Sequence, residues 1–128
     1  MKKWVIVTIV LVIIALLLYL IIPNLLISLK CKSYSEDKKW ECYRDIAIDK
    51  KSPRVCEKLQ DSLEKENCYY FYATRNEILD LSSCDKIQTQ DLKDKCYGSI
   101  AGIKNDETLC NNVLNQTLKE LCIKLSRE

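Results

Sequence analysis

The sequence predicts an all-α protein in which an N-terminal transmembrane helix precedes a short solenoid of four disulfide-stapled αα-hairpins. Three features of the 128-residue chain support this prediction. The chain begins with a long apolar run, and its 8 cysteines recur at nearly constant intervals. It also contains only 2 glycines and 2 prolines, which is few for a β-rich chain with many turns.

The first element is the apolar run, which extends from Trp4 to Ile22 without a charged residue. As a helix these 19 residues span about 28 Å, close to the roughly 30 Å hydrocarbon core of a bilayer. Residues 25–30 contain no small-residue cleavage site, which favours an uncleaved signal-anchor over a cleaved signal peptide. Pro23 is expected to kink the path near the bilayer surface.

The orientation of this anchor follows from the cysteines rather than from the charges. Lys2 and Lys3 precede the apolar run, but lysines also follow it, so the positive-inside rule does not decide. Cysteines at disulfide-like spacing are typical of an oxidising compartment. We therefore predict a single-pass cell-membrane protein, with residues 1–29 as a cytoplasmic Met-Lys-Lys plus anchor and residues 30–128 as an extracytoplasmic domain. Apart from Lys2 and Lys3, 18 basic and 18 acidic residues balance, so nucleic acid is not an expected partner.

The cysteines form four pairs whose members lie 11 or 12 positions apart. A short helix, a turn and a second helix bring such positions opposite each other, within reach of a disulfide. A hairpin of about 26 residues buries too little surface to be stable alone, so the hairpins are expected to stack. An alternative pairing joins Cys42/Cys56, Cys68/Cys84 and Cys96/Cys110. The favoured pairs define repeats 1 to 4: Cys31/Cys42, Cys56/Cys68, Cys84/Cys96 and Cys110/Cys122.

In repeats 2 to 4, a first helix is predicted to begin four positions before the first cysteine, at a good N-cap residue. These N-caps are Ser52, Asp80 and Asp106, and Leu59, Ile87 and Val113 follow on the buried face. Repeat 1 lacks such a cap, so its first helix is expected to continue the membrane segment. For the second helix, Asp61 with Glu64 and Thr117 with Glu120 are candidate capping boxes.

The second helices carry an apolar stripe at the second cysteine and one position after it in all four repeats, and four and five positions after it in repeats 1 to 3. These offsets cover about 140° of the helix circumference, enough for a core-facing surface. The stripe comprises Tyr43, Tyr69, Tyr97 and Ile123; Ile46, Tyr72 and Ile100; and Ala47, Ala73 and Ala101. Helix ends are expected near Asn76 and Asn105, or near Lys50 and Lys51.

Two segments carry a resemblance to known sequences: Cys68-Tyr69 through Ala73, and Lys93-Asp94-Lys95-Cys96-Tyr97 through Ala101. With them, residues 31–128 resemble uncharacterised archaeal membrane-anchored proteins that contain tandem cysteine-containing helical-hairpin repeats. The resemblance implies an anchored helical repeat and brings no function with it.

The composition gives little support for catalysis. Histidine is absent, which removes the commonest general base, and there is no Gly-rich phosphate loop. The cysteine spacing fits neither zinc ligation nor a Cys-x-x-Cys redox motif. We therefore predict that the protein is not an enzyme and has no catalytic residue, metal or cofactor.

Tyr70 and Phe71 are the candidate partner contact. They lie where the other repeats carry mostly polar residues, and exposed aromatic side chains are frequent anchors for partners. The alternative is that they pack on a neighbouring repeat. Asn115 begins an Asn-Gln-Thr glycosylation sequon. A lysine lies three positions before each second cysteine, either as a contact for an anionic surface or as a solvated side chain: Lys39, Lys65, Lys93 and Lys119.

These features predict a membrane-anchored extracytoplasmic helical-repeat protein that acts as a protein-interaction or envelope scaffold module. Its expected partners are the lipid bilayer and another envelope or membrane protein, because no flexible stalk separates the anchor from the repeats. The alternatives are a secreted or membrane-acting helical effector, either pore-forming or surface-binding, and a surface enzyme. The sequence leaves the oligomeric state and the partner's identity open.

Overall fold

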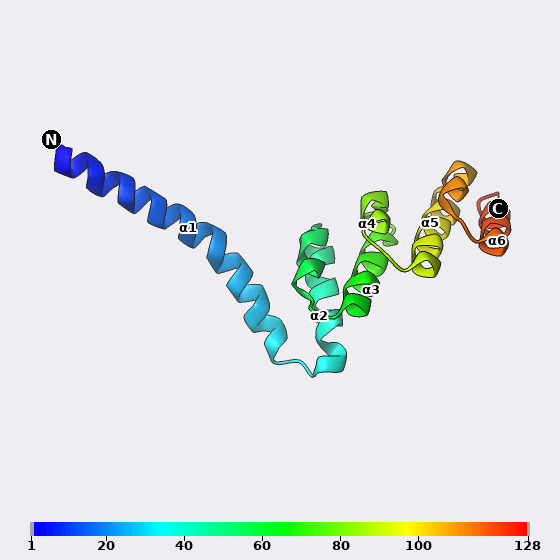
Figure 1. Ribbon diagram of the computed structural model, residues 1–128, viewed down its shortest axis with the longest axis horizontal. Coiled ribbons are helices and arrows are strands. Elements are labelled where there is room, and N and C mark those ends of the chain that lie inside the picture. Colours follow the sequence, from blue (N-terminus) through cyan, green and yellow to red (C-terminus); the bar gives the residue numbers. More distant parts are fainter. Residues whose placement is uncertain (1, 128) are drawn as a thin grey trace. The chain divides into compact units, whose positions relative to one another are not determined.

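The computed structural model describes residues 2–127, and over this range the chain is helical and contains no β-strand (Figure 1). The predicted all-α fold class is therefore confirmed. The chain divides into two compact parts, Met1–Ser35 and Glu36–Glu128.

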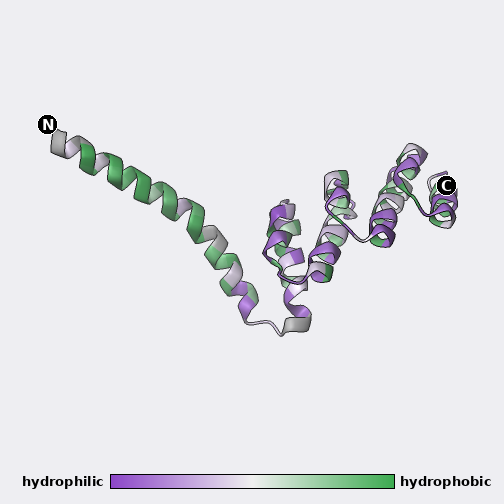
Figure 2. Ribbon diagram, in the orientation of Figure 1, coloured by the Kyte–Doolittle hydropathy of each residue, from purple (hydrophilic) through white to green (hydrophobic). Residues whose placement is uncertain are grey.

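The N-terminal part contains one helix, α1 (Lys2–Lys32). Its side chains from Ile6 to Ile22 are all exposed, and Figure 2 shows that this stretch is strongly hydrophobic. By length and composition, the segment Ile6–Lys32 is able to cross a membrane. The helix runs on through residue 23 and includes Cys31, so the first helix of repeat 1 continues the apolar helix, as predicted.

The C-terminal part consists of short helices joined by tight connections. The second helices of repeats 1 to 4 are α2 (Glu36–Asp49), α3 (Ser62–Ala73), α5 (Gln90–Lys104) and α6 (Gln116–Leu125). The first helices of repeats 2 to 4 are η1 (Pro53–Lys58), α4 (Leu81–Asp85) and η2 (Glu107–Asn112).

Two of these first helices are tighter than the predicted α-helices. η1 and η2 are 3₁₀-helices of 6 residues, and α4 is an α-helix of 5 residues. In η1 and η2, i→i−3 bonds such as Val55 N–H to the Ser52 carbonyl and Leu109 N–H to the Asp106 carbonyl take the place of i→i−4 bonds. The N-cap positions are nevertheless as predicted: Asp80 and Asp106 accept from the backbone N–H groups of Ser82 (3.1 Å) and Thr108 (3.0 Å). Ser52 is the N-cap of η1, although its side chain makes no capping bond.

In repeats 2 to 4 the disulfides join the two helices of one repeat. The bonded pairs are Cys56–Cys68, Cys84–Cys96 and Cys110–Cys122, with Cα–Cα distances of 5.7, 5.7 and 5.8 Å. Cys31 and Cys42 are disulfide-bonded as well, and no cysteine is free in the described part of the chain. The predicted pairs of repeats 2 to 4 are therefore confirmed, and the alternative pairing across the repeats is excluded.

The predicted apolar stripe forms the core of the C-terminal part. Its members are buried in every repeat except at Ile123, which is half-buried. The alanines are completely inaccessible, as expected where helices pack closely: Ala47, Ala73 and Ala101. The apolar residues that follow the first cysteines are buried too: Leu59, Ile87 and Val113. Each large side chain buried in this way stabilises the fold by roughly 1.5–3 kcal/mol.

Second helices that precede another repeat end in related turns. Lys51 after α2 and Asn105 after α5 adopt left-handed conformations, with φ of 48° and 51°. In both cases, the N-cap residue of the next repeat donates its N–H to the carbonyl of the buried alanine, which is a Schellman-type closure. The donors and acceptors are Ser52 and Ala47 (2.9 Å), Asp106 and Ala101 (3.0 Å) and, across a longer connection, Asp80 and Ala73 (3.1 Å).

Two predicted helix boundaries are wrong. α3 ends at Ala73 rather than near Asn76, because the longer connection of repeat 2 turns earlier and places Leu79 at φ 47°. α6 begins earlier than predicted, because Asn115 rather than Thr117 is its N-cap and accepts from the N–H of Leu118 at 3.1 Å. The cap predicted for α3 is correct: the Asp61 carboxylate accepts from the N–H of Glu64 at 2.9 Å.

Within the C-terminal part, the helices pack on their neighbours along the chain. η1 packs on α2 and α3, α3 packs on α4 and α5, and α5 packs on η2 and α6. Each of repeats 2 and 3 therefore contacts the repeat that follows it.

Candidate interaction surface

Tyr70 and Phe71 lie next to each other on α3 but contact different neighbours. The phenol Oη of Tyr70 lies 3.4 Å from the Oγ of Ser99 on α5, and the Tyr70 side chain is half-buried. Phe71 is 41% exposed, and its ring centroid lies 5.7 Å from that of Trp40 on α2. Tyr70 thus packs on the following repeat, whereas Phe71 remains accessible beside the preceding one.

Arg44 completes an aromatic–arginine cluster with Trp40 and Phe71. Its guanidinium carbon lies 5.2 Å from the ring centroid of Trp40 and 5.7 Å from that of Phe71. The Arg44 Nε and Nη2 atoms lie 2.9 and 2.8 Å from Oδ1 of Asp45. Cation–π contacts at exposed sites contribute about 0.5–1 kcal/mol, and here they hold the guanidinium in one orientation.

A surface hollow adjoins this cluster and includes two of its members. The residues that line it come from α2, α3 and the turn after α3: Arg44, Ile48, Phe71, Thr74 and Arg75. Two guanidinium groups and two large apolar side chains therefore share one depression. No acidic side chain is among the residues that line it.

A second hollow lies between α5 and α6 and is mostly apolar. Leu118, Leu121 and Leu125 of α6 form one wall, and Gly98 lies on the α5 side. A Cβ atom added to Gly98 would lie 3.8 Å from the Cβ of Cys122, so the two helices approach closely here. Leu121 and Leu125 remain 50% and 47% exposed.

Two buried carboxylates connect successive repeats. Asp94 on α5 is 1% exposed and accepts from the N–H groups of Leu114 (3.1 Å) and Asn115 (2.8 Å), just before α6. Glu66 on α3 is 8% exposed and accepts from the N–H of Thr89 (3.2 Å), just before α5. Each carboxylate therefore satisfies backbone donors in the turn of the following repeat. Neither residue was predicted to make a contact between repeats.

The ionisation of Asp94 matches this role. Burial by itself raises the pKa of a carboxyl group. At Asp94 the hydrogen bonds from the amides of Asn115 and Leu114, and from the Gln90 side chain at 2.7 Å, more than offset burial and lower the pKa below 3.8. Asp94 is consequently ionised at neutral pH, where charge-assisted bonds to amides are strongest.

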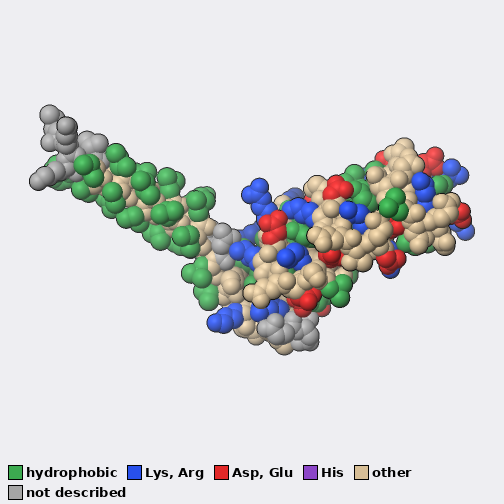
Figure 3. Space-filling model, in the orientation of Figure 1, with side chains coloured by type: hydrophobic (Ala, Val, Ile, Leu, Met, Phe, Trp, Pro, Cys, Tyr) green, Lys and Arg blue, Asp and Glu red, His purple; other side chains and the backbone are tan. Residues whose placement is uncertain are grey.

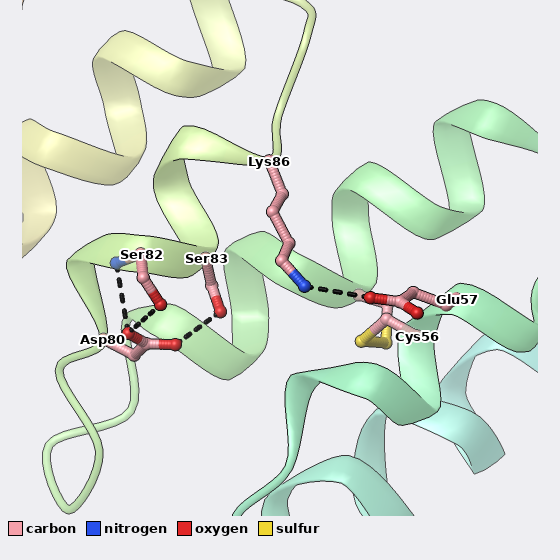
Figure 4. A network of polar contacts seen from close by, with 7 residues as sticks. Cys56, Glu57, Asp80, Ser82, Ser83 and Lys86 are labelled. Carbon is pink, nitrogen blue, oxygen red and sulfur yellow. Dashed lines mark hydrogen bonds and ion pairs between the residues drawn. A yellow bond between two sulfur atoms is a disulfide. The ribbon is translucent and has the colours of Figure 1, made fainter.

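Polar contacts next to the disulfides involve the tyrosine that follows the second cysteine. In repeat 3, the Oη of Tyr97 donates to Oδ1 of Asp85 at 2.5 Å, and burial together with this bond raises the pKa of Tyr97 to about 12. Lys86 of repeat 3 reaches back to repeat 2, as Figure 4 shows, and donates to Oε1 of Glu57 at 2.9 Å. The same ammonium lies 5.2 Å from the ring centroid of Tyr69.

The row of lysines does not form a concentrated basic patch. On the face of the C-terminal part shown in Figure 3, basic and acidic side chains are interspersed. Half-burial fits aliphatic stems that lie along the surface. All four lysines of the row are half-buried: Lys39, Lys65, Lys93 and Lys119.

The chemistry that these surfaces offer is non-covalent recognition by arginine, aromatic and leucine side chains. Over the described residues, no group of three or more His, Cys, Asp or Glu side chains is placed to hold a metal ion. Asn115 of the sequon is exposed, and its Oδ1 is engaged as the cap of α6.

Comparison with known proteins adds no assignment: no protein-family model, curated protein or solved structure matches this chain. The resemblance to archaeal anchored repeats remains a prediction.

Proposed function

We propose that the chain is a membrane-anchored, extracytoplasmic helical-repeat protein that serves as a protein-interaction or envelope scaffold module. In this proposal α1 is the signal-anchor, and the disulfide-closed helix pairs form a short solenoid that displays a binding surface. The observation that carries it is the packing of each helix pair of repeats 2 and 3 on the next pair, with the aromatic–arginine cluster left accessible.

The disulfides support the proposed location. All eight cysteines are disulfide-bonded, a state that a reducing cytosol does not maintain for structural thiols. An apolar helix directly before the first of these cysteines provides a route to an oxidising compartment while keeping the chain at the membrane.

The exposed side chains support a role in binding proteins. Repeats that contact only their neighbours create extended surfaces rather than deep pockets, and such surfaces are suited to macromolecular partners. Arg, Trp, Tyr and Phe are enriched in protein–protein interfaces, and Trp40, Arg44 and Phe71 are of these types. The balanced surface charge favours no polyanion.

Site-specific photo-crosslinking tests the binding role. p-Benzoylphenylalanine is introduced in place of Phe71 of the full chain in its native cells, with the exposed position Gln88 as the control. We expect a light-dependent adduct with another membrane or envelope protein at position 71 and none at position 88. Absence of any protein adduct from position 71 would contradict an interaction module.

The same cells test the membrane topology. A C-terminal tag should be removed by protease added to intact cells, and alkylation without reductant should modify no cysteine. A tag that stays protected refutes the extracytoplasmic location. A mature chain that begins beyond residue 29 and is released from the membrane would favour the secreted effector instead.

A further inference from the structure

The hollow beside the aromatic–arginine cluster has the features of a small binding site. Ile48 and Phe71 supply apolar surface, while Arg44 and Arg75 supply guanidinium groups. The hydroxyl of Thr74 donates to a backbone carbonyl of its own helix at 2.9 Å, so the arginines are the principal donors that the hollow presents to a ligand.

Arg44 is held in place before any ligand arrives. It rests against two aromatic rings, and its side chain is only 25% exposed. Asp45 engages Nε and Nη2, so the N–H groups of Nη1 stay available. A guanidinium that is already oriented loses little conformational freedom on binding, which favours affinity.

Arg75 adds a second cation that is not neutralised. It follows Thr74, the C-cap of α3, and is exposed. Among the described residues, no acidic side chain forms an ion pair with Arg75. The hollow therefore carries excess positive charge next to apolar walls, although the domain as a whole is neutral.

We propose that this hollow binds an acidic peptide segment of the partner protein, in which an Asp or Glu side chain lies next to an apolar residue. The carboxylate accepts hydrogen bonds from Arg44 and Arg75, and the apolar neighbour packs on Phe71 and Ile48. The planar guanidinium matches the two oxygens of a carboxylate. This inference rests on the proposed function and assigns its contact surface.

A peptide fits better than a phosphate-bearing lipid headgroup. The phosphodiester of a lipid headgroup carries one negative charge, as a carboxylate does, so the arginines alone do not distinguish the two ligands. The apolar walls formed by Ile48 and Phe71 do, because an acidic side chain in a polypeptide brings neighbouring side chains that reach them and a polar headgroup does not.

The test uses the full chain in nanodiscs of neutral phosphatidylcholine and a fluorescent twelve-residue peptide that alternates Glu with Leu. Arg44→Gln/Arg75→Gln should weaken binding about tenfold or more, because charge-assisted bonds dominate such contacts. Arg54→Gln/Arg127→Gln removes the same charge outside the hollow and should leave affinity within about twofold. A peptide with Gln in place of Glu should not bind measurably.

Two further measurements keep the outcome decisive. Arg75→Gln alone should preserve the unfolding transition, because the Arg75 guanidinium forms no ion pair among the described residues, and should still weaken binding several-fold. Equal binding by the wild type and the Arg44/Arg75 variant overturns the proposal. Arginine-dependent binding to vesicles with 30% phosphatidylglycerol but not to the peptide also overturns it, in favour of a headgroup phosphate.

The crosslinking experiment separates this inference from the proposed function. An adduct at position 71 that persists in the Arg44/Arg75 variant overturns the acidic-peptide site alone. No adduct in the wild type overturns the interaction module itself.

Discussion

Replacing Asp94 with alanine should lower the free energy of unfolding by about 2–4 kcal/mol. The substitution leaves the N–H groups of Leu114 and Asn115, and the amide of Gln90, without their acceptor. A buried donor without a partner costs about 1–3 kcal/mol. Because the side chains of Leu114 and Asn115 are exposed, water reaches part of this turn, and we expect the lower half of the range, about 1–2 kcal/mol, for each of these two backbone donors; the Gln90 side chain is exposed, so its amide turns to water.

The other repeats supply matched controls. Glu66 occupies the equivalent position in repeat 2 and accepts one backbone bond, so Glu66→Ala should cost about 1–2 kcal/mol. Glu120 occupies it in repeat 4 and is exposed, and among the described residues it accepts only from the side chain of Gln116, at 3.1 Å. Glu120→Ala should therefore change stability by less than about 0.5 kcal/mol. Urea unfolding of the full chain in detergent, followed by circular dichroism without reductant, measures all three variants.

The order of these losses is the critical result. If Asp94→Ala and Glu120→Ala were equally damaging, the carboxylate bonds between repeats would not be what stabilises the turn. An Asp94→Ala variant within 0.5 kcal/mol of the wild type would refute the argument directly.

Acidification gives an independent check on Asp94. Its folded-state pKa is depressed by the amide bonds, so the stability it contributes is fully present above the unfolded pKa of about 3.9. This contribution is lost as the pH falls through the lower, folded-state pKa. The stability difference between the wild type and Asp94→Asn should therefore be constant from pH 7 to 5 and shrink below about pH 4. A difference that does not change with pH would show that the ionised carboxylate is not required.

Three further substitutions test other parts of the fold. Cys84→Ala/Cys96→Ala should lower the free energy of unfolding by about 3 kcal/mol and reduce amide-exchange protection in repeats 2 and 4 as well as in repeat 3. An unchanged melting temperature would contradict coupling between the repeats. Tyr97→Phe removes the bond to Asp85 and should lower the free energy of unfolding by about 1 kcal/mol. It should also abolish the tyrosine absorbance change near pH 12; if that change persists in the variant, it belongs to another residue. Gly98→Ala should stabilise by up to about 1 kcal/mol, since its Cβ would meet the Cys122 Cβ at 3.8 Å, and a measured loss would mean that α5 and α6 tolerate no added methyl group.

The features that the sequence predicted well are those set by local spacing. A 12-residue separation between cysteines leaves room for one turn, and this alone favoured the pairs Cys56–Cys68 and Cys84–Cys96. The helical period likewise located the buried stripe down to Ala73 and Ala101. These patterns depend on the geometry of one helix or one hairpin, so no knowledge of the neighbouring repeats was required.

The errors arose where a competing local interaction changed the backbone. Thr117 and Asn115 are both good caps, and the choice between them depended on Asp94, a residue of the preceding repeat that bonds to the N–H of Asn115. The first helices of repeats 2 to 4 were expected to be α-helical, but of these only α4 is, whereas η1 and η2 close with i→i−3 bonds.

The interaction surface was only half predictable for the same reason. Phe71 was identified because it departs from the polar residues of the other repeats. Trp40 and Arg44 were missed because they belong to another helix, and their contact with Phe71 exists only once α2 and α3 pack. Arg75 had no distinguishing sequence signal; it matters because the turn after α3 places it at the same hollow.

One signal in the sequence would have located the contacts between repeats. The position two residues before the second cysteine is acidic in repeats 2, 3 and 4, where it is Glu66, Asp94 and Glu120, but it is Trp40 in repeat 1. The acid is buried in repeats 2 and 3, where it binds the turn of the next repeat, and exposed at Glu120, after which no further repeat is described. At Trp40 the contact with the next repeat is made by a tilted ring pair with Phe71 instead of by a carboxylate. The exchange of an acid for an aromatic residue thus leaves this junction apolar and close to Arg44, which is where the proposed acidic peptide would bind.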